Sequence, residues 1–483
     1  MAGLLTFVVS ASSAFAQQNL SWDANGVWPV SGGTGNWDTT SPLWYNGVAF
    51  QAWNNAGLDN AVFGGSAGNV RLTTPITVHD MTFNVSNYVF PSSNTIALSF
   101  GGVNPTITTN AAFTQFFFPL TGGTGFTKSG SGSLQLGGTS TGYTGVTTVN
   151  AGTLAVSNSL ALGLSTAASN LVLNDGATIA FSSPSFNHNY TLTGGIVNLQ
   201  MTGINNLVSG SPTLTASTTL SLNGTGTTGT LSGNLADTGA NILSVTKSNT
   251  GRVILSGNNS YTGATTVTRG RLQINSAGAL SSGSNLVFNG ATGLGGSIEL
   301  TSSFGSFTRG LGAGPGQVQW VGDGGFLSSG VAGIVNLGGA GATVTWGSGS
   351  FVPDGNRLIL GTSSNNNLDF QNSIDLSGGV RSIQGDGGTI TGHARIGGTL
   401  SGSGGLNQVG NGFLELMGSN TYTGGTFLTS GTLVVSANAN LGESSGMLTF
   451  DGGTLRNTSA FTMARNITIN ASGGIFFYRC RSR

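Results

Sequence analysis

Charged side chains that could carry out acid–base chemistry gather in one stretch of this chain. They are Asp354, Arg357, Asp369, Asp375, Arg381, Asp386, His393 and Arg395. Asp354 and Asp375 are about one repeat length apart, so in stacked turns their carboxylates could lie about 5 Å from each other. Such a pair can raise one pKa and abstract a proton from a polysaccharide. The alternatives are glycan binding and turn formation, and we expect turn residues, because Asp354 and Asp386 each precede glycine.

Other patterns associated with chemistry are weak. His79, His188 and His393 are far apart and have no metal-ligand spacing, so we expect polar surface positions for them. Cys480 is the one cysteine, which excludes an intramolecular disulfide. The segment 224–229 matches GxGxxG, but no helix pattern follows it, so its phosphate-binding context is missing. We therefore predict no catalytic residue, no cofactor and no metal site.

The composition excludes several protein classes. Of 483 residues, 83 are glycine, only 6% are charged, and the formal net charge is zero. A nucleic-acid partner is not expected, because binding it requires a basic surface. The 37% hydrophobic residues, including 26 Phe, suffice to form a core. A neutral, glycine-rich β-protein remains.

An internal repeat is the most informative pattern. Its copies begin at Tyr143, Tyr261 and Tyr422 and read YTGVTTVNAGTL, YTGATTVTRGRL and YTGGTFLTSGTL. The full repeats are expected near 125–163, 244–290 and 405–450. Apolar and small polar residues alternate within each copy, which predicts short strands separated by glycine turns. We expect the repeat glycines to need either positive φ or a close backbone approach. These are Gly145, Gly263 and Gly424.

Short strands in a repeating unit predict an all-β fold. We expect a right-handed parallel β-helix (β-solenoid) over residues 64–474, with about 20 turns in the chain at roughly 20–25 residues per turn. The low charge agrees with this fold, because stacked turns place like side chains about 4.8 Å apart. Stacked charges would repel, whereas stacked Asn, Ser and Thr attract each other.

The second copy resembles a known family through Lys247, Leu255, Gly257, Asn259 and Gly270, which surround its Tyr-Thr-Gly motif. This family is the autotransporter-associated β-strand repeat, also called the passenger-associated transport repeat. The first copy departs from the family pattern at Thr141, where Asn is expected, and the third at Gln408, where Lys is expected. The Trp-rich opening and the stretch 346–376 also look like parts of such passengers. The resemblance implies a passive role, in which repeats help a surface passenger fold and cross the outer membrane through a translocation barrel.

The two ends differ from the repeats. Residues 1–16 are expected to be a signal peptide, because Ala14-Phe15-Ala16 resembles a signal peptidase site. Residues 17–63 are expected to form a Trp-rich N-terminal cap, although a sugar-stacking platform is an alternative. Their tryptophans are Trp22, Trp28, Trp37, Trp44 and Trp53. Residues 475–483, IFFYRCRSR, are expected to be an aberrant or truncated tail, with the translocation barrel absent from this chain.

The predicted function is therefore that of an exported bacterial autotransporter-type passenger. It would be structural or adhesive, non-enzymatic, and located at the cell surface, on the outer membrane or outside the cell. Each turn would fold on the turn before it, so that stacking discourages backsliding. Possible partners are surface glycans and host or neighbouring cell surfaces. The alternative function is a secreted β-helix protein that binds or degrades polysaccharides.

Overall fold

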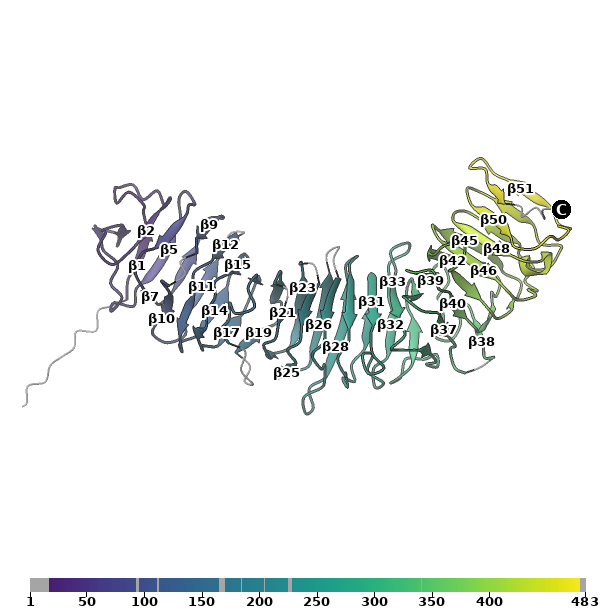
Figure 1. Ribbon diagram of the computed structural model, residues 1–483, viewed down its shortest axis with the longest axis horizontal. Helices are drawn as coiled ribbons and strands as arrows, with labels where there is room; N and C mark the ends of the chain where they lie inside the picture. Colours follow the sequence, from purple (N-terminus) through teal and green to yellow (C-terminus); the bar gives the residue numbers. More distant parts are fainter. Residues whose placement is uncertain are drawn as a thin grey trace, which may run out of the picture. The chain divides into compact units, whose positions relative to one another are not determined.

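The computed structural model describes residues 17–92, 95–110, 113–164, 170–183, 185–203, 205–224, 228–339 and 341–477. The expected signal peptide, 1–16, and residues 478–483 of the expected tail lie outside these ranges. The chain divides into two compact units, Met1–Ser165 (unit 1) and Thr166–Arg483 (unit 2). Over the described residues both units consist of short β-strands, and the one helical element is the 3-10 helix η1 (Asn438–Leu441). The predicted all-β parallel solenoid is confirmed (Figure 1).

Unit 1 winds its strands into stacked sheets. The first sheet contains, in spatial order, β17 (Thr147–Val149), β14 (Phe126–Ser129), β11 (Thr106–Thr109), β8 (Met81–Phe83), β5 (Asn60–Phe63), β1 (Asn19–Trp22), β3 (Trp44–Tyr45) and β4 (Phe50–Gln51). The second contains β18 (Thr153–Val156), β15 (Ser133–Leu136), β12 (Phe113–Phe116) and β9 (Tyr88–Phe90). The third contains β16 (Gly142–Tyr143), β13 (Leu120–Gly122), β10 (Leu98–Phe100) and β7 (Ile76–Val78), and β2 (Gly35–Trp37) pairs with β6 (Val70–Leu72).

Unit 2 repeats this arrangement. Its 13-stranded sheet contains, in order, β21 (Ser185–Phe186), β24 (Asn206–Val208), β27 (Thr228–Leu231), β29 (Arg252–Leu255), β31 (Gly270–Ile274), β33 (Gly296–Leu300), β36 (Gly324–Ser328), β39 (Arg357–Thr362), β42 (Val380–Gly387), β45 (Gly405–Gly410), β47 (Thr426–Leu428), β49 (Leu448–Phe450) and β51 (Ile467–Ile469). Beside it run β20 (Thr178–Phe181), β23 (Gly195–Met201), β26 (Thr218–Gly224), β28 (Leu243–Ser248), β30 (Thr265–Val267), β32 (Leu286–Phe288) and β35 (Val318–Trp320), and also β19 (Leu171–Leu173), β22 (Tyr190–Leu192) and β25 (Pro212–Leu214).

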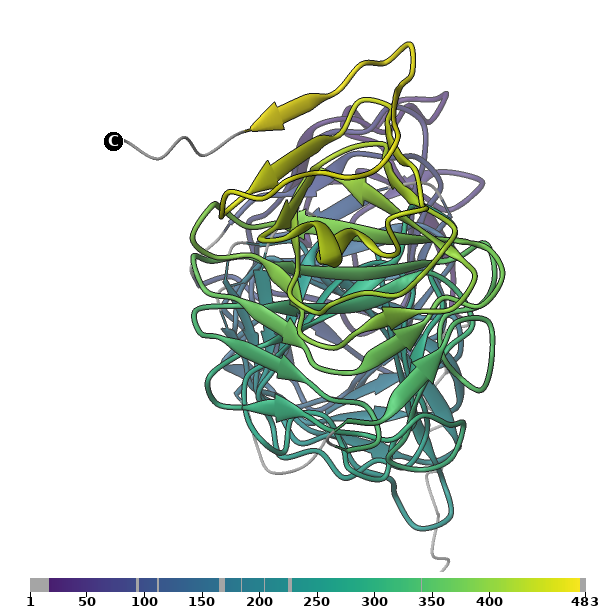
Figure 2. The ribbon, with the colours of Figure 1, turned by 90° about the vertical axis from the view of Figure 1, so that its right-hand side faces the viewer.

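The C-terminal half of unit 2 has two further sheets. The eight-stranded sheet contains β34 (Ser306–Phe307), β37 (Gly333–Val335), β40 (Leu368–Phe370), β43 (Ala394–Ile396), β46 (Phe413–Leu416), β48 (Thr432–Val435), β50 (Thr454–Asn457) and β52 (Ile475–Phe477). The three-stranded sheet contains β38 (Thr343–Thr345), β41 (Ser373–Asp375) and β44 (Leu400–Ser401). Figure 2 shows successive turns of this half, in green and yellow, each running once around a common interior.

The alternation of side chains builds the core. Inward residues of successive turns share one register, so Phe90, Phe116, Leu136 and Val156 form a single buried column. Because each buried side chain of this size contributes about 1.5–3 kcal/mol, stability accumulates turn by turn.

The turns are less uniform than predicted. Side chains one turn apart are separated by 20 residues at Gln115 and Gln135 but by 34 at Ser328 and Thr362. The described residues therefore make about 17 turns, fewer than the expected number, because later turns carry longer loops.

The tryptophans of residues 17–63 lie at the N-terminal edge of unit 1. There β3 pairs antiparallel with β1, and β4 pairs antiparallel with β3, whereas the other strand pairs described for this unit are parallel. Four of the five rings are buried and pack together at centroid distances of 4.8–5.2 Å; these are Trp22, Trp37, Trp44 and Trp53. Only Trp28 is exposed, so a platform made of all five tryptophans is wrong.

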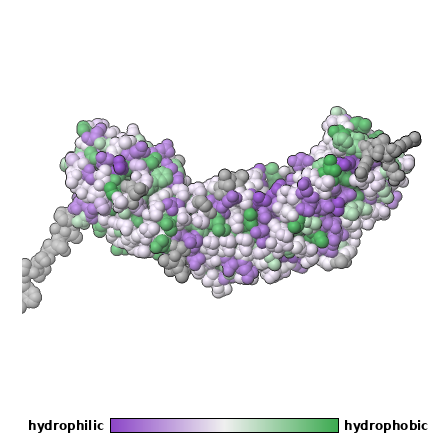
Figure 3. All heavy atoms as spheres, viewed as in Figure 1, coloured by the Kyte–Doolittle hydropathy of each residue, from purple (hydrophilic) through white to green (hydrophobic). Residues whose placement is uncertain are grey.

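The face in Figure 3 is mostly of intermediate hydropathy, with scattered hydrophilic and hydrophobic residues. Exposed apolar side chains gather on the last two described strands, β51 and β52, which Figure 3 colours green beside the grey atoms. These include Ile467, Ile469, Ile475 and Phe477. Among the described residues, no helix has the length and apolar character needed to cross a membrane.

Candidate functional site: a buried polar clamp in each repeat

Both lysines of the chain point into the solenoid. Lys128 on β14 and Lys247 on β28 occupy inward strand positions and are fully buried. The Lys128 ammonium donates to the carbonyl oxygens of Ser129, Gly130 and Ala151, at 2.9, 2.9 and 3.0 Å. An ammonium group has three donors, and here all three are used.

The second repeat contains the same arrangement. Lys247 Nζ donates to the carbonyls of Ser248, Asn249 and Arg269, at 2.5, 2.6 and 3.2 Å. In each repeat two acceptors belong to the lysine's own turn and the third belongs to the following turn. The lysine therefore joins two turns through their backbones.

Burial changes the titration of these amines. Desolvation lowers the pKa of Lys128 and of Lys247 to about 8, from an ordinary value of 10.5. No carboxylate is among the hydrogen-bond acceptors of either ammonium group. The carbonyl oxygens thus supply the polar contacts that make burial of the amine tolerable.

The third repeat replaces the lysine by Gln408. Its side chain is also fully buried, and Nε2 donates to the carbonyl of Val409 at 3.1 Å. Its Oε1 has no hydrogen-bond partner among the described residues. Gln408, which departs from the family pattern, therefore keeps one backbone contact and leaves a buried acceptor unpaired among the described residues.

The repeat tyrosines are also buried. The hydroxyl groups of Tyr143, Tyr261 and Tyr422 each share a hydrogen bond with the threonine four residues later, at 3.0, 2.6 and 2.6 Å. Burial raises the pKa of Tyr143 and Tyr261 to about 12 and also raises that of Tyr422. The phenol therefore stays protonated, and each ring is buried four residues before a strand, β17, β30 or β47.

The repeat asparagine connects three turns. Asn259 Oδ1 accepts from the backbone nitrogen of Leu235, at 2.8 Å, and its Nδ2 donates to the carbonyl of Ala279, at 2.6 Å. Asn420 makes the same two bonds. Its Oδ1 accepts from the backbone nitrogen of Leu400 at 2.8 Å, and its Nδ2 donates to the carbonyl of Asn440 in the following turn at 2.5 Å.

The first repeat uses a different residue for half of this role. Gapless alignment places Thr141 opposite the asparagines, but Ser140 Oγ accepts from the backbone nitrogen of Leu120 at 2.9 Å. A hydroxyl group at this position reaches the preceding turn. Sequence alignment missed this role because the contact is shifted by one position along the chain.

We call the buried Lys or Gln, the Tyr and the Asn or Ser of each repeat the polar clamp.

Glycines in the repeats allow neighbouring turns to approach each other closely. Gly145 and Gly424 need a close backbone approach, because a Cβ atom would lie 2.6 and 2.5 Å from the nitrogens of Gly125 and Gly405. Of the two expectations for these glycines, close approach is correct. The positive φ values occur instead at Gly152, Gly270 and Gly431, at 68°, 71° and 69°.

The charged stretch 354–395 does not form one site. Its members lie on three sheets: Asp375 on β41, Asp369 and Arg395 on β40 and β43, and Arg381 and Asp386 on β42. The backbone of Arg357 donates to Asp323 at 2.9 Å. The residues are therefore distributed around the solenoid and do not all share one groove.

Asp354 and Asp375 do not form the stacked pair that their spacing allowed. Asp375 is in register with Thr345 and Ser401, because a turn here spans about 30 residues, as the bond from Asn372 to Ala342 shows. Asp354 pairs with Arg381 instead, at 2.6 Å.

The histidines are more buried than predicted. His188 is buried, with Nδ1 3.0 Å from Asn170 Oδ1, and His393 is buried, with Nε2 3.1 Å from Glu415 Oε2. His188 occupies an inward position of an alternating segment, whereas His393 directly precedes the inward Ala394 of β43. The described residues contain no group of three or more His, Cys, Asp or Glu side chains that could hold a metal ion.

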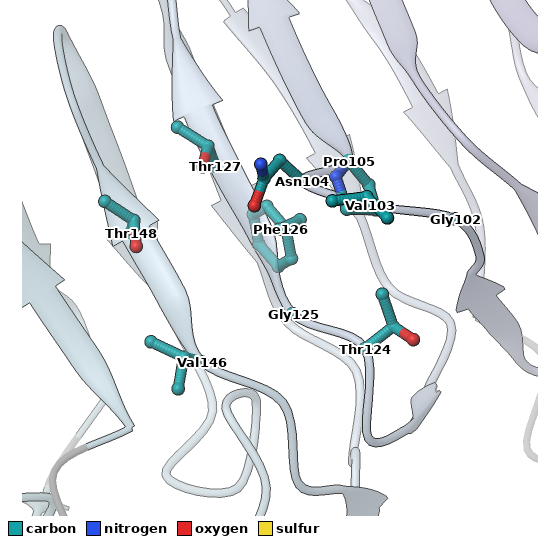
Figure 4. A pocket seen from close by; sticks show the side chains of 10 residues that line it. All are labelled: Gly102, Val103, Asn104, Pro105, Thr124, Gly125, Phe126, Thr127, Val146 and Thr148. Atoms are coloured by element: carbon teal, nitrogen blue, oxygen red, sulfur yellow. The ribbon is translucent and has the colours of Figure 1, made fainter.

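Two hollows lie on the solenoid surface. One, in unit 1, has a volume of about 390 Å³ and is lined by uncharged residues of three successive turns, including Val103, Pro105, Phe126, Val146 and Thr148 (Figure 4). The other, in unit 2, has a volume of about 410 Å³ and contains the Asp354–Arg381 pair.

Comparison with known proteins agrees with the geometry of the clamp. The family model described as Passenger-associated-transport-repeat matches residues 126–156, 245–274 and 406–435. Each match contains one inward Lys128, Lys247 or Gln408 and one buried tyrosine. The limits expected for the larger domains stay a prediction.

The chain is also similar to a large adhesin. It is 31% identical to the Adhesin BmaC autotransporter of Brucella suis biovar 1 (strain 1330), over 529 aligned positions that cover 91% of this chain. The chain spans only 15% of the length of that relative. No solved structure matches significantly. This chain thus contains three passenger-associated-transport repeats and, over most of its length, is similar to part of an autotransporter adhesin.

Proposed function

We propose that the chain acts as part of an exported autotransporter-type passenger, displayed at the cell surface or released outside the cell, with a structural or adhesive role. The observation that carries the proposal is the polar clamp, in which Lys247 and Asn259 bind backbone groups of neighbouring turns. These contacts form only when the next turn arrives. At the repeats, folding of the next turn therefore satisfies groups that the previous turn leaves open.

The mechanism follows from this order of events. A turn that emerges from an outer-membrane translocation barrel stacks on the folded turns outside, and the clamp closes over it. Backward movement would then expose a buried ammonium or amide without its hydrogen bonds, which costs about 1–3 kcal/mol for each group. The barrel and a surface to which the passenger adheres are the partners of this proposal.

We assign no catalytic role to the chain. The charged residues of the stretch 354–395 are spread over three sheets, and Arg381 and Glu415 are each held in ion pairs. This distribution supports a passive passenger over a polysaccharide-degrading enzyme.

The experiment measures surface display of the full chain, fused to an outer-membrane translocation unit. We expect protease added to intact cells to reach the wild-type chain. The double variant Lys247→Met, Asn259→Ala should cross more slowly and accumulate in the periplasm. The control is Thr266→Ala, which changes an outward-facing residue of β30 that belongs to no clamp. Equal display of the clamp variant and the control, at equal synthesis, would refute the proposed role of the clamp.

A further inference from the structure

One hollow in unit 2 is lined by polar side chains that keep part of their hydrogen-bonding capacity free within the described residues. It is bordered by Trp346, Ser348, Asp354, Ser377 and Arg381, together with three glycines. The side chain of Arg381 is only 7% exposed, whereas the side chain of Asp354 is 74% exposed. The pair therefore has one fixed member in the wall and one member at the mouth.

The backbone positions this pair. Arg381 Nε donates to the carbonyl of Leu376 at 2.7 Å, and Nη1 donates to Asp354 Oδ1 at 2.6 Å. A Cβ atom on Gly379 would lie 3.2 Å from the guanidinium carbon, and one on Gly347 would overlap Asp354 Oδ1. A side chain at either glycine would therefore crowd one member of the pair.

The lining also contains local strain. Ser377 has φ of 56°, in the left-handed region that non-glycine residues seldom occupy. Such a conformation costs on the order of 1 kcal/mol, and it is most often found at binding and switch sites. Here it turns the chain between Asp375 and Arg381, at the edge of the hollow.

Four polar groups of the lining have hydrogen-bonding capacity left. Within the described part of the chain, Asp354 Oδ2, Arg381 Nη2 and the hydroxyl groups of Ser348 and Ser377 have no hydrogen-bond partner. One is an acceptor, one is a donor, and two can do both. Adjacent hydroxyl groups of a sugar offer the same combination of donors and acceptors.

The charge of the hollow narrows the ligand class. The carboxylate and the guanidinium cancel, so neither an anion nor a cation gains a net attraction. A single carboxylate also falls short of the six to eight oxygen ligands that Ca²⁺ takes. We infer that this hollow is a binding subsite for a neutral saccharide, held through two adjacent hydroxyl groups by Asp354 and Arg381. The inference rests on the proposed adhesive function and gives it a ligand class.

The test uses ¹⁹F NMR of the full chain labelled with fluorotryptophan, because Trp346 lines the hollow. The probes are methyl α-mannoside, methyl β-galactoside and, as an anionic comparison, N-acetylneuraminic acid, each at millimolar concentration. We expect a neutral methyl glycoside to shift the Trp346 resonance in a saturable way, while the four buried tryptophans of unit 1 stay unchanged. Trp346→Phe assigns the signal.

Two variants decide the outcome. Asp354→Asn and Gly379→Ala should each weaken saccharide binding by about ten-fold or more, because the first removes the carboxylate charge and its second acceptor oxygen and the second crowds the guanidinium group. Asp451→Asn, a carboxylate outside the hollow, should bind like the wild type. A hollow that binds no neutral glycoside, or that binds equally in both variants, overturns the inference. Binding only of N-acetylneuraminic acid also overturns it. None of these results affects the display experiment, so failure of the subsite and failure of the passenger function are distinguishable.

Discussion

The ammonium nitrogen of Lys128 lies 3.0 Å from the carbonyl oxygen of Ala151, a residue 23 positions later that belongs to the next turn of the solenoid. Lys247 and Arg269 have the same relation, at 3.2 Å and a separation of 22 residues. A cation buried among carbonyl oxygens, without a carboxylate, depends on the next turn for its full set of hydrogen bonds. This dependence leads to testable predictions about stability.

Removing the Lys247 amine should loosen one turn. Lys247→Met keeps a long unbranched side chain but leaves carbonyl oxygens unpaired, so we expect the local free energy of unfolding to fall by about 1–3 kcal/mol. Lys247→Gln should lose less, because Gln408 in the third repeat still donates to a carbonyl. Hydrogen exchange over residues 246–270 measures the loss, and exchange around Lys128 is the internal control. Identical exchange in both variants and the wild type would contradict the clamp.

The buried lysines should make stability depend on pH. Their pKa of about 8 in the folded chain is below the value of about 10.4 in an unfolded chain, so the unfolded state binds more protons between these limits. Stability from these groups is therefore fully present above about pH 10 and is lost as pH falls through about 8. Urea unfolding should show a higher midpoint at about pH 9.5 than at about pH 7.5.

The double variant Lys128→Met, Lys247→Met isolates this effect. It should lose the rise between the two pH values, while the buried tyrosines, whose pKa values are near 12, remain unchanged. A variant with the same pH dependence as the wild type would show that the lysines do not cause it.

Asn259 should hold three turns together. Asn259→Ala leaves Leu235 N and Ala279 O without their side-chain partner, and we expect a loss of about 1–3 kcal/mol. Asn258→Ser added to Asn259→Ala should recover part of it, because Ser140, which occupies the same repeat position as Asn258, makes the corresponding bond to Leu120 N. The chain has two lysines, both buried, so the rate of modification by an amine-reactive reagent reports opening. Lys247 should react faster in Asn259→Ala, and Lys128 should not.

A charge on an inward position should break the stack. Val267→Asp on β30 and Leu272→Asp on β31 each place an unpaired carboxylate in the core. Limited proteolysis should then cut within residues 250–290, where the wild type resists. Thr266→Asp introduces the same charge on the outward side and should keep resistance. Full resistance of Val267→Asp would disprove the inward assignment.

Glu415 should respond to acid. A hydrogen bond from His393 and the charge of Arg395 lower the pKa of this carboxyl group below its usual value of 4.5. A lowered pKa means that the stabilisation is present above the unfolded-state value and is lost as pH falls through the folded-state value. The hydrogen-exchange protection factors of β43 and β46, which correct for the intrinsic rate at each pH, should therefore fall on acidification below about pH 4.5. In Glu415→Gln this fall should be absent, with protection already lower at neutral pH.

Sequence reasoning identified the periodic part of this molecule. The period of two around Leu272 and Leu433 correctly placed these residues inside, and the three tyrosine motifs correctly located the repeats that the family model matches. It went wrong wherever the turn length varied. The possibility that Asp354 and Asp375 stack rested on a constant turn length, and a longer loop places them out of register.

The clamp itself could not be derived from the alignment alone. Lys247 and Asn259 were recognised as motif residues, but nothing in the sequence says that the amine points inward or which carbonyl oxygens receive it. Ser140 was overlooked because a hydroxyl one position away can reach the same backbone nitrogen only after the turns stack.

The amino-acid sequence by itself determined the β-solenoid, because alternation of small polar and apolar residues with frequent glycine permits short strands and little else. It also determined the repeat family, through residues at fixed spacing. Only the tertiary structure decided which residues meet across turns, such as Lys128 with Ala151 and Arg381 with Asp354. The physical reason is that contacts between turns depend on the length of every loop, and loop length varies without disturbing the local pattern of the strands.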